Sequence, residues 1–484
     1  MNKPVRRIAI FCGLLTLALL LRSNWLQFVQ ADSLKTNKHN HRVAIARYSH
    51  PRGDIIVDGK AVTGSQETDG IDYKYRRSYT NGEMWAPVTG YSSQVFDGSQ
   101  LEKLYDKILT GDDDKLFFNR TVDMFTGKAQ KGGDVITTLN SKAQEAAFKG
   151  LNGKRGAVAA LDPRTGKILA LASTPSYDPS KIAGANDGKN WTTLEQDKDQ
   201  PMLNRALRAT YPPGSTFKVV TAAAALENGL YTDPDQNTKT PPKYILPDSV
   251  TPLANEGSIQ CENVSMREAL RISCNTVFGK ISADLGNEKM KKQAEKFGYN
   301  SEVLTPVRAE KSVYPKDNRP QNAMDGIGQA SNRATPLQMA MIVSAIANNG
   351  KLMEPYMVDK VRAPNLNIIE THQPKQMSQP LSAANAQKIQ SMMETVVQKG
   401  TGTSAQIDGV TVGGKTGTAQ HGVDNSGKPY AWFISYAKTD NGSPVAVAVV
   451  VEGDDTTARD DVAGGALAAP IAKNVMEAVL STSK

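Results

Sequence analysis

The chain has 484 residues, of which 39% are apolar and 22% charged, so it is a folded protein of two or three domains rather than a disordered or fibrous one. Its mean hydropathy of −0.41 excludes a protein that crosses a membrane many times. Lys3, Arg6, Arg7 and Arg22 supply half of the net charge of +8, and the rest of the chain is close to balanced, with no basic stripe. We therefore expect no nucleic-acid partner.

The N-terminus carries a targeting or anchoring segment. An uninterrupted apolar run from Ile8 to Leu21 is too short, at about 1.5 Å per residue, for a bilayer core of about 30 Å. Extension to Val29 gives enough length if Arg22 reaches out to the lipid headgroups. We favour this uncleaved anchor over a signal peptide cleaved after Ala31. The excess of basic residues before the run predicts a single-pass protein of the cell membrane, with the rest of the chain outside the cytoplasm.

The next segment, residues 32–150, is polar and rich in turns. It contains short strand-like stretches such as Asp54–Val57, which precedes an Asp58–Gly59 turn, and it holds no constellation of catalytic residue types. We expect an irregular, β-rich, non-catalytic stalk or interaction module. The expected domains of the chain are 1–31, 32–150 and 151–484.

The last segment predicts a mixed α+β domain. Gly156–Asp162 and Lys167–Ala172 are typical of two strands joined by a Pro163–Gly166 turn. Pairing these strands with the last three gives an antiparallel five-stranded sheet flanked by helices. The last three strands are expected at 410–418, 430–437 and 445–451. Helices are expected from 215 to 226, from 265 to near 273, from 276 to 284, from 336 to Gly350, from 384 to 399 and from 465 to 480.

Ser215 and Lys218 form the first candidate constellation. Positions i and i+3 share a helix face, so the Ser215 hydroxyl and the Lys218 amine can lie within hydrogen-bond reach. At the start of a buried helix, desolvation would lower the pKa of the lysine so that it can accept a proton, and free backbone N–H groups could stabilise an oxyanion. The alternative is an N-cap serine followed by an exposed lysine. A Ser–His–Asp triad has little support, because no G-x-S-x-G occurs and none of the five histidines lies near such a turn.

Two further triplets follow in order. Ser273–Asn275 interrupts a helix and offers a hydroxyl and an amide, and Lys415–Gly417 lies on a predicted strand, where the glycine would let an extended substrate lie close. The ordered set S-x-x-K, S-x-N and K-T-G is that of penicillin-binding proteins and serine β-lactamases, which this chain resembles. Each triplet alone is weak evidence, but the three together at this spacing are specific.

The resemblance extends to class B penicillin-binding proteins. Arg52–Asp58 resembles the motif that opens their non-catalytic domain, and about 120 residues before the first hairpin are too few for the glycosyltransferase domain of class A proteins. The short stalk and the end just after the last helix are most like an actinobacterial type within the class. The segments that resemble transpeptidase domains are Gly156–Pro163, Pro212–Lys218, Thr335–Ala340, Lys415–Gln420 and Ala431–Phe433.

This resemblance implies a D,D-transpeptidase that cross-links peptidoglycan stem peptides ending in D-Ala-D-Ala through a serine acyl-enzyme, which β-lactam antibiotics trap. The catalytic residues it implies are Ser215 as nucleophile, Lys218 as base, Ser273 as proton relay and Lys415 as positive charge beside the substrate carboxylate. The substrate-binding residues it implies are Asn275, Thr416, Gly417 and Thr418. The oxyanion hole it implies consists of the backbone N–H groups of Ser215 and Thr418. No metal or cofactor is expected.

Other functions stay open. A D,D-carboxypeptidase would differ only in its acceptor, and a β-lactamase-like hydrolase would need a deacylating base that the sequence does not reveal. Cys274 also stands where β-lactamases commonly carry aspartate. The non-enzymatic alternatives are a β-lactam-binding sensor and a cell-wall scaffold. Besides the stem peptides and β-lactams, the expected partners are the cytoplasmic membrane and other cell-wall synthesis or division proteins.

The cysteines give one further expectation. Cys12 lies in the apolar run, which leaves Cys261 and Cys274 in the part expected outside the cytoplasm. A disulfide between them would brace the loop that carries Ser273 and Asn275. Two buried free thiols are the alternative.

Overall fold

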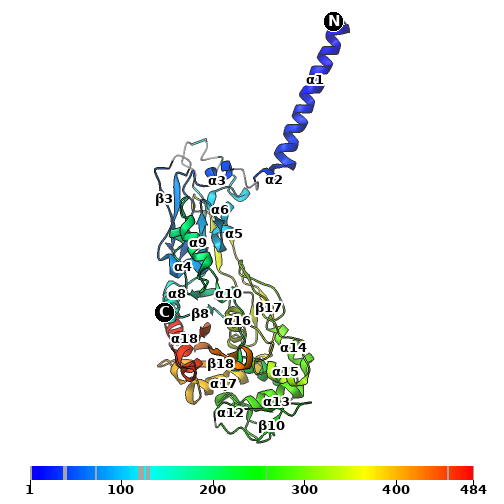
Figure 1. Cartoon of the computed structure of the whole chain (residues 1–484), viewed down its shortest axis with the longest axis vertical. Coiled ribbons are helices and arrows are strands. Elements are labelled where there is room, and N and C mark those ends of the chain that lie inside the picture. The colour runs from blue at the N-terminus through cyan, green and yellow to red at the C-terminus, as the bar shows by residue number, and fades with distance from the viewer. Residues whose placement is uncertain are drawn as a thin grey trace.

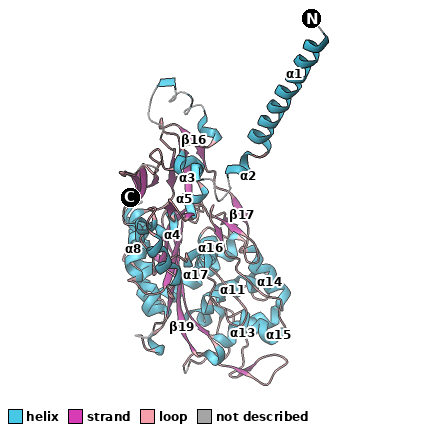
Figure 2. Cartoon of the chain, turned by 45° about the horizontal axis from the view of Figure 1, so that its top comes forward, coloured by secondary structure: helices cyan, strands magenta, loops and turns pink. Residues whose placement is uncertain are grey.

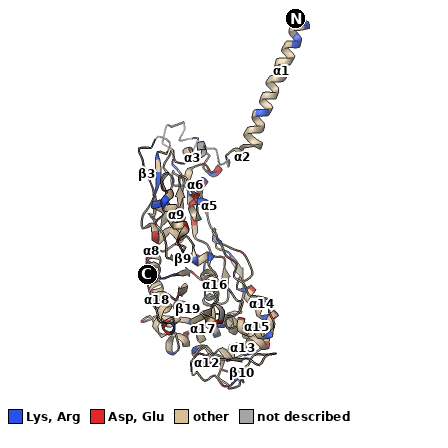
Figure 3. Ribbon diagram, viewed as in Figure 1, with Lys and Arg blue, Asp and Glu red and all other residues tan. Residues whose placement is uncertain are grey.

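The N-terminal helix stands apart from the folded body in the computed structural model (Figure 1). α1 (Lys3–Asn24) continues into a π-helical turn, η1 (Trp25–Val29), and the 27 residues together are long and apolar enough to cross a membrane. Figure 3 shows the basic residues of α1 near its two ends, with an uncharged stretch between them. The structure describes residues 3–35, 41–70, 73–117, 121, 125–126, 131–257, 259–454 and 457–482.

The module that follows is built on a small mixed sheet. β1 (Ile55–Val57) turns into β2 (Lys60–Ala61) at Asp58 and Gly59, both of which have the positive φ expected of such a turn. β1 also pairs in parallel with β7 (Asp134–Thr137), where Ile55 lies opposite Val135. The other elements of the module are α2 (Ala31–Lys35), α3 (His41–Arg47), β3 (Thr63–Glu67), β4 (Tyr75–Tyr79), α4 (Gly82–Thr89), β5 (Ser92–Ser93), β6 (Asp97–Gly98), α5 (Gln100–Leu104), α6 (Asp106–Thr110) and η2 (Asp114–Leu116).

Two strands of this sheet come from far along the chain. β15 (Val358–Arg362) pairs antiparallel with β7, and β16 (Ile368–Thr371) pairs with β15, so the strand order is β16-β15-β7-β1-β2. The expected domains 32–150 and 151–484 assign residues 358–371 to the second domain, whereas their strands pair in the sheet of the first. Nothing in the alternation of residues 358–371 distinguishes a strand of one sheet from a strand of the other. The two parts of the body are therefore connected by three covalent crossings rather than one.

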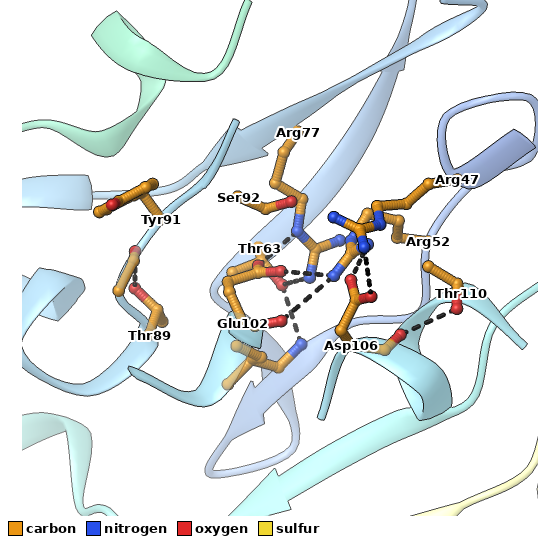
Figure 4. Close-up of polar contacts among 12 residues, drawn as sticks. Arg47, Arg52, Thr63, Arg77, Thr89, Tyr91, Ser92, Glu102, Asp106 and Thr110 are labelled. Carbon is orange, nitrogen blue, oxygen red and sulfur yellow. Dashed lines mark hydrogen bonds and ion pairs between the residues drawn. The ribbon is translucent and has the colours of Figure 1, made fainter. Parts of the chain in front are cut away.

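A cluster of buried charges holds the module together (Figure 4). Arg52, which precedes β1, donates to Glu102 of α5 at 3.1 Å and to Asp106 of α6 at 2.8 Å. Arg77 of β4 donates to the other oxygen of Glu102 at 2.5 Å and to Thr63 of β3 at 2.8 Å. Because Arg52, Arg77 and Glu102 are almost completely buried, their opposite charges replace the water that each has lost.

The second sheet is the expected antiparallel one, and its order is β18-β19-β20-β8-β9. The N-terminal hairpin joins the C-terminal strands through β8 and β20, where Val158 lies opposite Val449. The prediction of an α+β fold with a five-stranded sheet is confirmed. The five strands are β8 (Gly156–Leu161), β9 (Ile168–Thr174), β18 (Thr411–His421), β19 (Gly427–Thr439) and β20 (Gly442–Glu452).

Helices cover both faces of this sheet (Figure 2). Along β20, Ala446, Ala448 and Val450 face one hydrophobic core and the residues between them face the other, as the two-residue period of a strand requires. α16 (Pro336–Ala347) packs on the first face, and α8 (Ser141–Leu151) and α18 (Ala469–Thr482) pack on the second. α8 lies inside the segment expected to belong to the N-terminal module, yet it is part of the second core.

The remaining helices surround the first core, except α9 (Gly188–Gln196), whose Trp191 and Leu194 pack on a separate cluster of Ala86, Tyr177 and Ile182. The predicted ones are α11 (Lys218–Glu227), α12 (Met266–Arg271), α13 (Asn275–Leu285) and α17 (Ala383–Lys399), and those that the sequence analysis missed are α9, α10 (Arg205–Arg208), α14 (Asn287–Lys296) and α15 (Arg319–Asp325). The side chain of Ser265 caps α12 by accepting from the N–H of Glu268, as the capping box predicts. The helix expected from Ser215 begins instead as a 3₁₀ turn, η4 (Gly214–Phe217). Gly214 there has a φ of 54°, which is outside the α-helical region.

Candidate active site

Ser215 lies on η4, at the wall of a cavity of about 500 Å³. Asn275 of α13 and Thr418 of β18 line the same cavity, as does Glu256 from the loop before α12. The N–H of Gly214 donates to the carbonyl of Gly328 at 2.9 Å, which fixes the turn just before the serine. The structure thus brings one residue from each of the first two triplets, and the residue that follows the third, to one cavity.

Lys218 is completely buried at the start of α11. Its Nζ donates to the carbonyl oxygen of Ser273 at 2.7 Å, to Ser273 Oγ at 3.3 Å and to Asn275 Oδ1 at 2.8 Å. The direct Ser215–Lys218 hydrogen bond that helical spacing predicts is not among these contacts. The amine is instead directed to Ser273 and Asn275, whose three oxygen atoms match the three N–H donors of a lysine.

Lys415 approaches the same hydroxyl from β18. Its Nζ donates to Ser273 Oγ at 2.9 Å and to the carbonyl oxygen of Thr416 at 2.8 Å, and its side chain is also completely buried. Burial lowers the pKa of Lys415 to about 7. Burial, and then the charge of Lys415, lower the pKa of Lys218 well below its usual range, and Glu256 opposes both shifts. Both lone pairs of Ser273 Oγ are thus occupied by amines, which leaves its proton available for donation.

The loop that carries Ser273 is held by several contacts. Ser273 has a φ of 66°, so the chain turns sharply between α12 and α13. The N–H groups of Asn275 and Thr276, at the start of α13, donate to Asn255 Oδ1 at 2.8 and 3.0 Å. Asn275 Nδ2 donates in turn to the carbonyl of Ala254 at 3.0 Å. Asn275 is therefore fixed from both sides, with its oxygen toward Lys218.

A disulfide joins Cys261 to Cys274 in the structure, with the two Cα atoms 6.1 Å apart. It connects Cys261, which follows Asn255 in the loop before α12, to Cys274, which lies between Ser273 and Asn275. Both cysteines are buried. The geometry is that of the brace expected from the two cysteines outside the apolar helix.

The K-T-G triplet differs from expectation at two positions. A Cβ on Gly417 would lie 3.0 Å from Thr216 Cγ2 and 3.2 Å from the carbonyl oxygen of Pro213, so the glycine allows β18 to approach η4 rather than leaving room for substrate. Thr416 places its hydroxyl 2.6 Å from that of Thr401 and does not line the cavity. Of the residues expected to bind substrate, Thr418 and Asn275 are the two that face it.

Three residues of this site were not predicted from the sequence. Asn255 and Glu256 come from a loop without a recognisable motif, and only their positions near the S-x-N triplet in space reveal them. Gln329 lies between α15 and α16, and with its carboxamide oriented to satisfy both groups it pairs with the backbone N–H and carbonyl of Gln420 at 3.2 Å each. None of the described residues forms a group of three His, Cys, Asp or Glu that could hold a metal ion.

Comparison with known proteins agrees with this geometry. The model of the penicillin-binding protein transpeptidase domain matches residues 156–477, more than half of the chain. The chain belongs to this family. A second model, the penicillin-binding protein A dimerisation domain, matches residues 52–135, which contain Arg52, Arg77 and Glu102 of the buried charge cluster.

Similar proteins are known from mycobacteria. The chain is 41% identical to the peptidoglycan D,D-transpeptidase PbpA of Mycobacterium tuberculosis and 39% identical to that of Mycolicibacterium smegmatis, in each case over 99% of both chains. It is also similar to the solved structure of penicillin-binding protein A from M. tuberculosis as an imipenem acyl-enzyme complex, with a TM-score of 0.84, 38% identity, and coverage of 90% of this chain and 100% of that one. The expected likeness to class B proteins of the actinobacterial type is confirmed.

Proposed function

We propose that the chain is a peptidoglycan D,D-transpeptidase that acts through an acyl-enzyme on Ser215 and is inhibited by β-lactams. The observation that carries this proposal is the position of Ser273 Oγ between the amines of Lys218 and Lys415, beside a cavity that Ser215 lines. The names of the mycobacterial relatives and the acyl-enzyme structure support it.

In the first step, Ser215 Oγ bonds to the carbonyl carbon of the penultimate D-Ala of the stem peptide. Its proton goes to Lys218, whose lowered pKa supports a neutral amine at working pH. The backbone N–H groups of Ser215 and Thr418 would stabilise the oxyanion, and the close packing of η4 on β18 supports this assignment. Lys415 and Thr418 would bind the terminal carboxylate, and Asn275 the amide of the donor.

In the second step, the tetrahedral intermediate collapses and the C–N bond to the last D-Ala breaks. Ser273 gives its own proton to the departing amine and takes one from Lys218, so the proton first removed from Ser215 ends on Ser273 and both Lys218 and Ser273 are restored. An amine of a second stem peptide then attacks the ester carbon. Its proton passes through Lys218 to Ser215 Oγ as the C–O bond breaks, so the new peptide bond forms and Ser215 is regenerated. The short contacts from both lysines to Ser273 support a relay that needs no histidine.

We further propose that α1 spans the cytoplasmic membrane with the N-terminus inside, so that the sheet and its cavity lie outside. The basic residues before the apolar stretch support this direction. The Cys261–Cys274 disulfide supports it independently, because such bonds persist outside the reducing cytoplasm. For the N-terminal module we propose contacts with other cell-wall synthesis proteins, which in-cell cross-linking from its exposed residues would test.

The function is tested by incubating the full chain in detergent with fluorescent penicillin and following the intact mass. We expect a long-lived adduct on the peptide that contains Ser215. Rapid return of the free enzyme would indicate a β-lactamase, and no adduct would indicate a scaffold. A second assay with a D-Ala-D-Ala peptide and an acceptor amine separates the two peptidase activities, because a transpeptidase forms the cross-linked product and a carboxypeptidase only the trimmed peptide.

A further inference from the structure

A loop between two helices supports both sides of the active site. This α15–α16 loop, residues 326–332, accepts the N–H of Gly214 at the carbonyl of Gly328, and its Gln329 pairs with the backbone of Gln420 on β18. A Cβ on Gly328 would lie 2.6 Å from the nitrogen of Gly214, so the two backbones are in close contact. The position of Ser215 therefore depends on the conformation of this loop.

Asp325, the last residue of α15, closes the loop. Its Oδ1 accepts the N–H groups of Ser331 and Asn332 at 3.1 Å each, and its backbone carbonyl accepts from Asn332 Nδ2 at 3.0 Å. The side chain is completely buried. The last two residues of the loop are thereby tied to the end of α15, where the loop begins.

The second oxygen of Asp325 has no protein donor. Asp325 Oδ2 and Asp317 Oδ2 are both buried, and no N–H or hydroxyl group of the described residues donates to either, which leaves each only the other carboxyl group as a partner. Burial first, and then the charge of Asp317 and a hydrogen bond to it, raise the pKa of Asp325 to about 8. Two neighbouring carboxyl groups in such surroundings cannot both ionise without a large cost, whereas one proton between them satisfies both oxygens.

Tyr314 and Arg333 are the ionisable side chains of the described surroundings besides the two carboxyl groups. Tyr314, whose pKa is raised chiefly by burial and then by Asp325, donates to Asn322 at 2.7 Å. Arg333 directs its guanidinium to the carbonyls of Ala330 and Asn332. The adjoining helices present the hydroxyls of Thr221 on α11 and Ser282 on α13, which bind the carbonyls of Gly326 and Asn322 and do not titrate in this range.

We propose that Asp317 and Asp325 share one proton at neutral pH, and that this proton keeps the α15–α16 loop closed against the turn of Ser215. Asp325 is then a positioning residue, which acts on the nucleophile through Gly328 and Gly214. Loss of the proton in alkaline solution leaves two facing carboxylates, which repel each other and open the loop. The kinetic part of this inference rests on the proposed function, but its effect on stability does not.

The effect on stability has a definite sign. The folded chain keeps the proton of Asp325 up to about pH 8, whereas an unfolded aspartate releases it near pH 3.9, so the folded state binds more protons between these values. The ratio of folded to unfolded protein should therefore fall by up to tenfold per pH unit across this window. Asp325→Asn keeps the acceptor for Ser331 and Asn332, offers an N–H to Asp317 and does not titrate.

The test compares denaturation midpoints of the full chain at pH 5, 6, 7 and 8 for the wild type, Asp325→Asn and the control Asp284→Asn, which removes an acid paired with Lys280 on α13. We expect the midpoint of Asp325→Asn to fall less with pH than those of the other two, and its rate of acylation by penicillin to decline less above pH 8. Equal slopes in all three proteins would overturn the proposal, whether or not acylation occurs.

A second measurement needs no variant. The infrared carbonyl stretch of a protonated carboxyl should be present in the wild type at pH 7 and disappear between pH 7 and 9, and its absence at pH 7 would overturn the shared proton. A third measurement compares the denaturation midpoints at pH 8 with and without calcium or magnesium chloride. Stabilisation of the wild type but not of Asp325→Asn would mean that the two carboxylates bind a cation instead, which would also overturn the proposal.

Discussion

Two buried charge clusters in this molecule have opposite character. In the N-terminal module, Arg52 and Arg77 lie on either side of Glu102, and every buried charge has an opposite one in contact. Beside the cavity, Lys218 and Lys415 both donate to Ser273, and neither is within ion-pair distance of a carboxylate of the described residues. Among the described residues, these clusters hold the most completely buried lysines and arginines apart from Arg205.

The charges of the first cluster stabilise the fold, and those of the second prepare the chemistry. In the paired cluster, burial lowers the pKa of Arg52, but the charges of Glu102 and Asp106 outweigh burial and raise it overall. Burial of two like charges has the opposite effect, so both lysines move toward the neutral form. A neutral amine can accept a proton and a guanidinium cannot, which makes the second cluster the reactive one.

The largest expected effect comes from removing the nucleophile. Ser215→Ala should abolish covalent labelling by penicillin, because no other hydroxyl takes its place on η4 at the cavity. The circular dichroism spectrum and the denaturation midpoint should stay close to those of the wild type. Labelling that persists in this variant would remove Ser215 from the mechanism.

Replacement of each buried lysine by arginine sharpens the comparison within the reactive cluster. Lys218→Arg should lower the acylation rate by about a thousandfold, since it removes the only proposed base. Lys415→Arg keeps the positive charge beside the substrate carboxylate and should cost about tenfold, because the planar guanidinium fits less well. Stopped-flow acylation rates measure both. Equal losses would contradict the division of roles between the two residues.

Breaking the paired cluster should affect stability and not chemistry. Glu102→Gln leaves two arginines without their shared carboxylate and should lower the free energy of unfolding by about 3–5 kcal/mol. The acylation rate of the folded fraction should be unchanged. Lys103→Met, on the neighbouring exposed position of α5, is the matched control and should have little effect. A large change in acylation rate with Glu102→Gln would show that the two clusters are coupled.

The smallest expected effect concerns the disulfide. Removing it by the double variant Cys261→Ala, Cys274→Ala should lower the free energy of unfolding by about 3 kcal/mol. It should slow acylation only several-fold, because Asn255 Oδ1 still accepts the N–H groups at the start of α13. The full chain, denatured without reductant, should contain one reactive thiol, that of Cys12. Three reactive thiols would disprove the bond.

Much of this arrangement follows from local sequence. The five strands of the second sheet were predicted because hydrophobic runs bounded by turn residues specify them, and Ser265, Thr335 and Gly350 specify the ends of α12 and α16. The three triplets were recognised because their residue types and order are characteristic. Those features depend on neighbours within a few positions of the chain.

The rest depends on contacts between distant segments. Residues 358–371 form strands of either sheet equally well by sequence, and only tertiary pairing with β7 decides which. Gly417 was interpreted as space for substrate, but the atoms that require it belong to η4, 200 residues earlier. Asp325 was not predicted because aspartates at helix ends are common. Its buried oxygen without a donor is visible only in the folded structure.

The crossing of β15 and β16 into the N-terminal sheet has a practical consequence for truncated proteins. A fragment limited to residues 156–477 would keep every catalytic residue but would leave the β7 edge of β15 without its partner. It would also lack α8, so that apolar residues of β8, β9 and α18 would meet water. An exposed strand edge next to uncovered apolar surface promotes aggregation. Truncated proteins for crystallisation and inhibitor screening should therefore begin no later than Arg52, before β1.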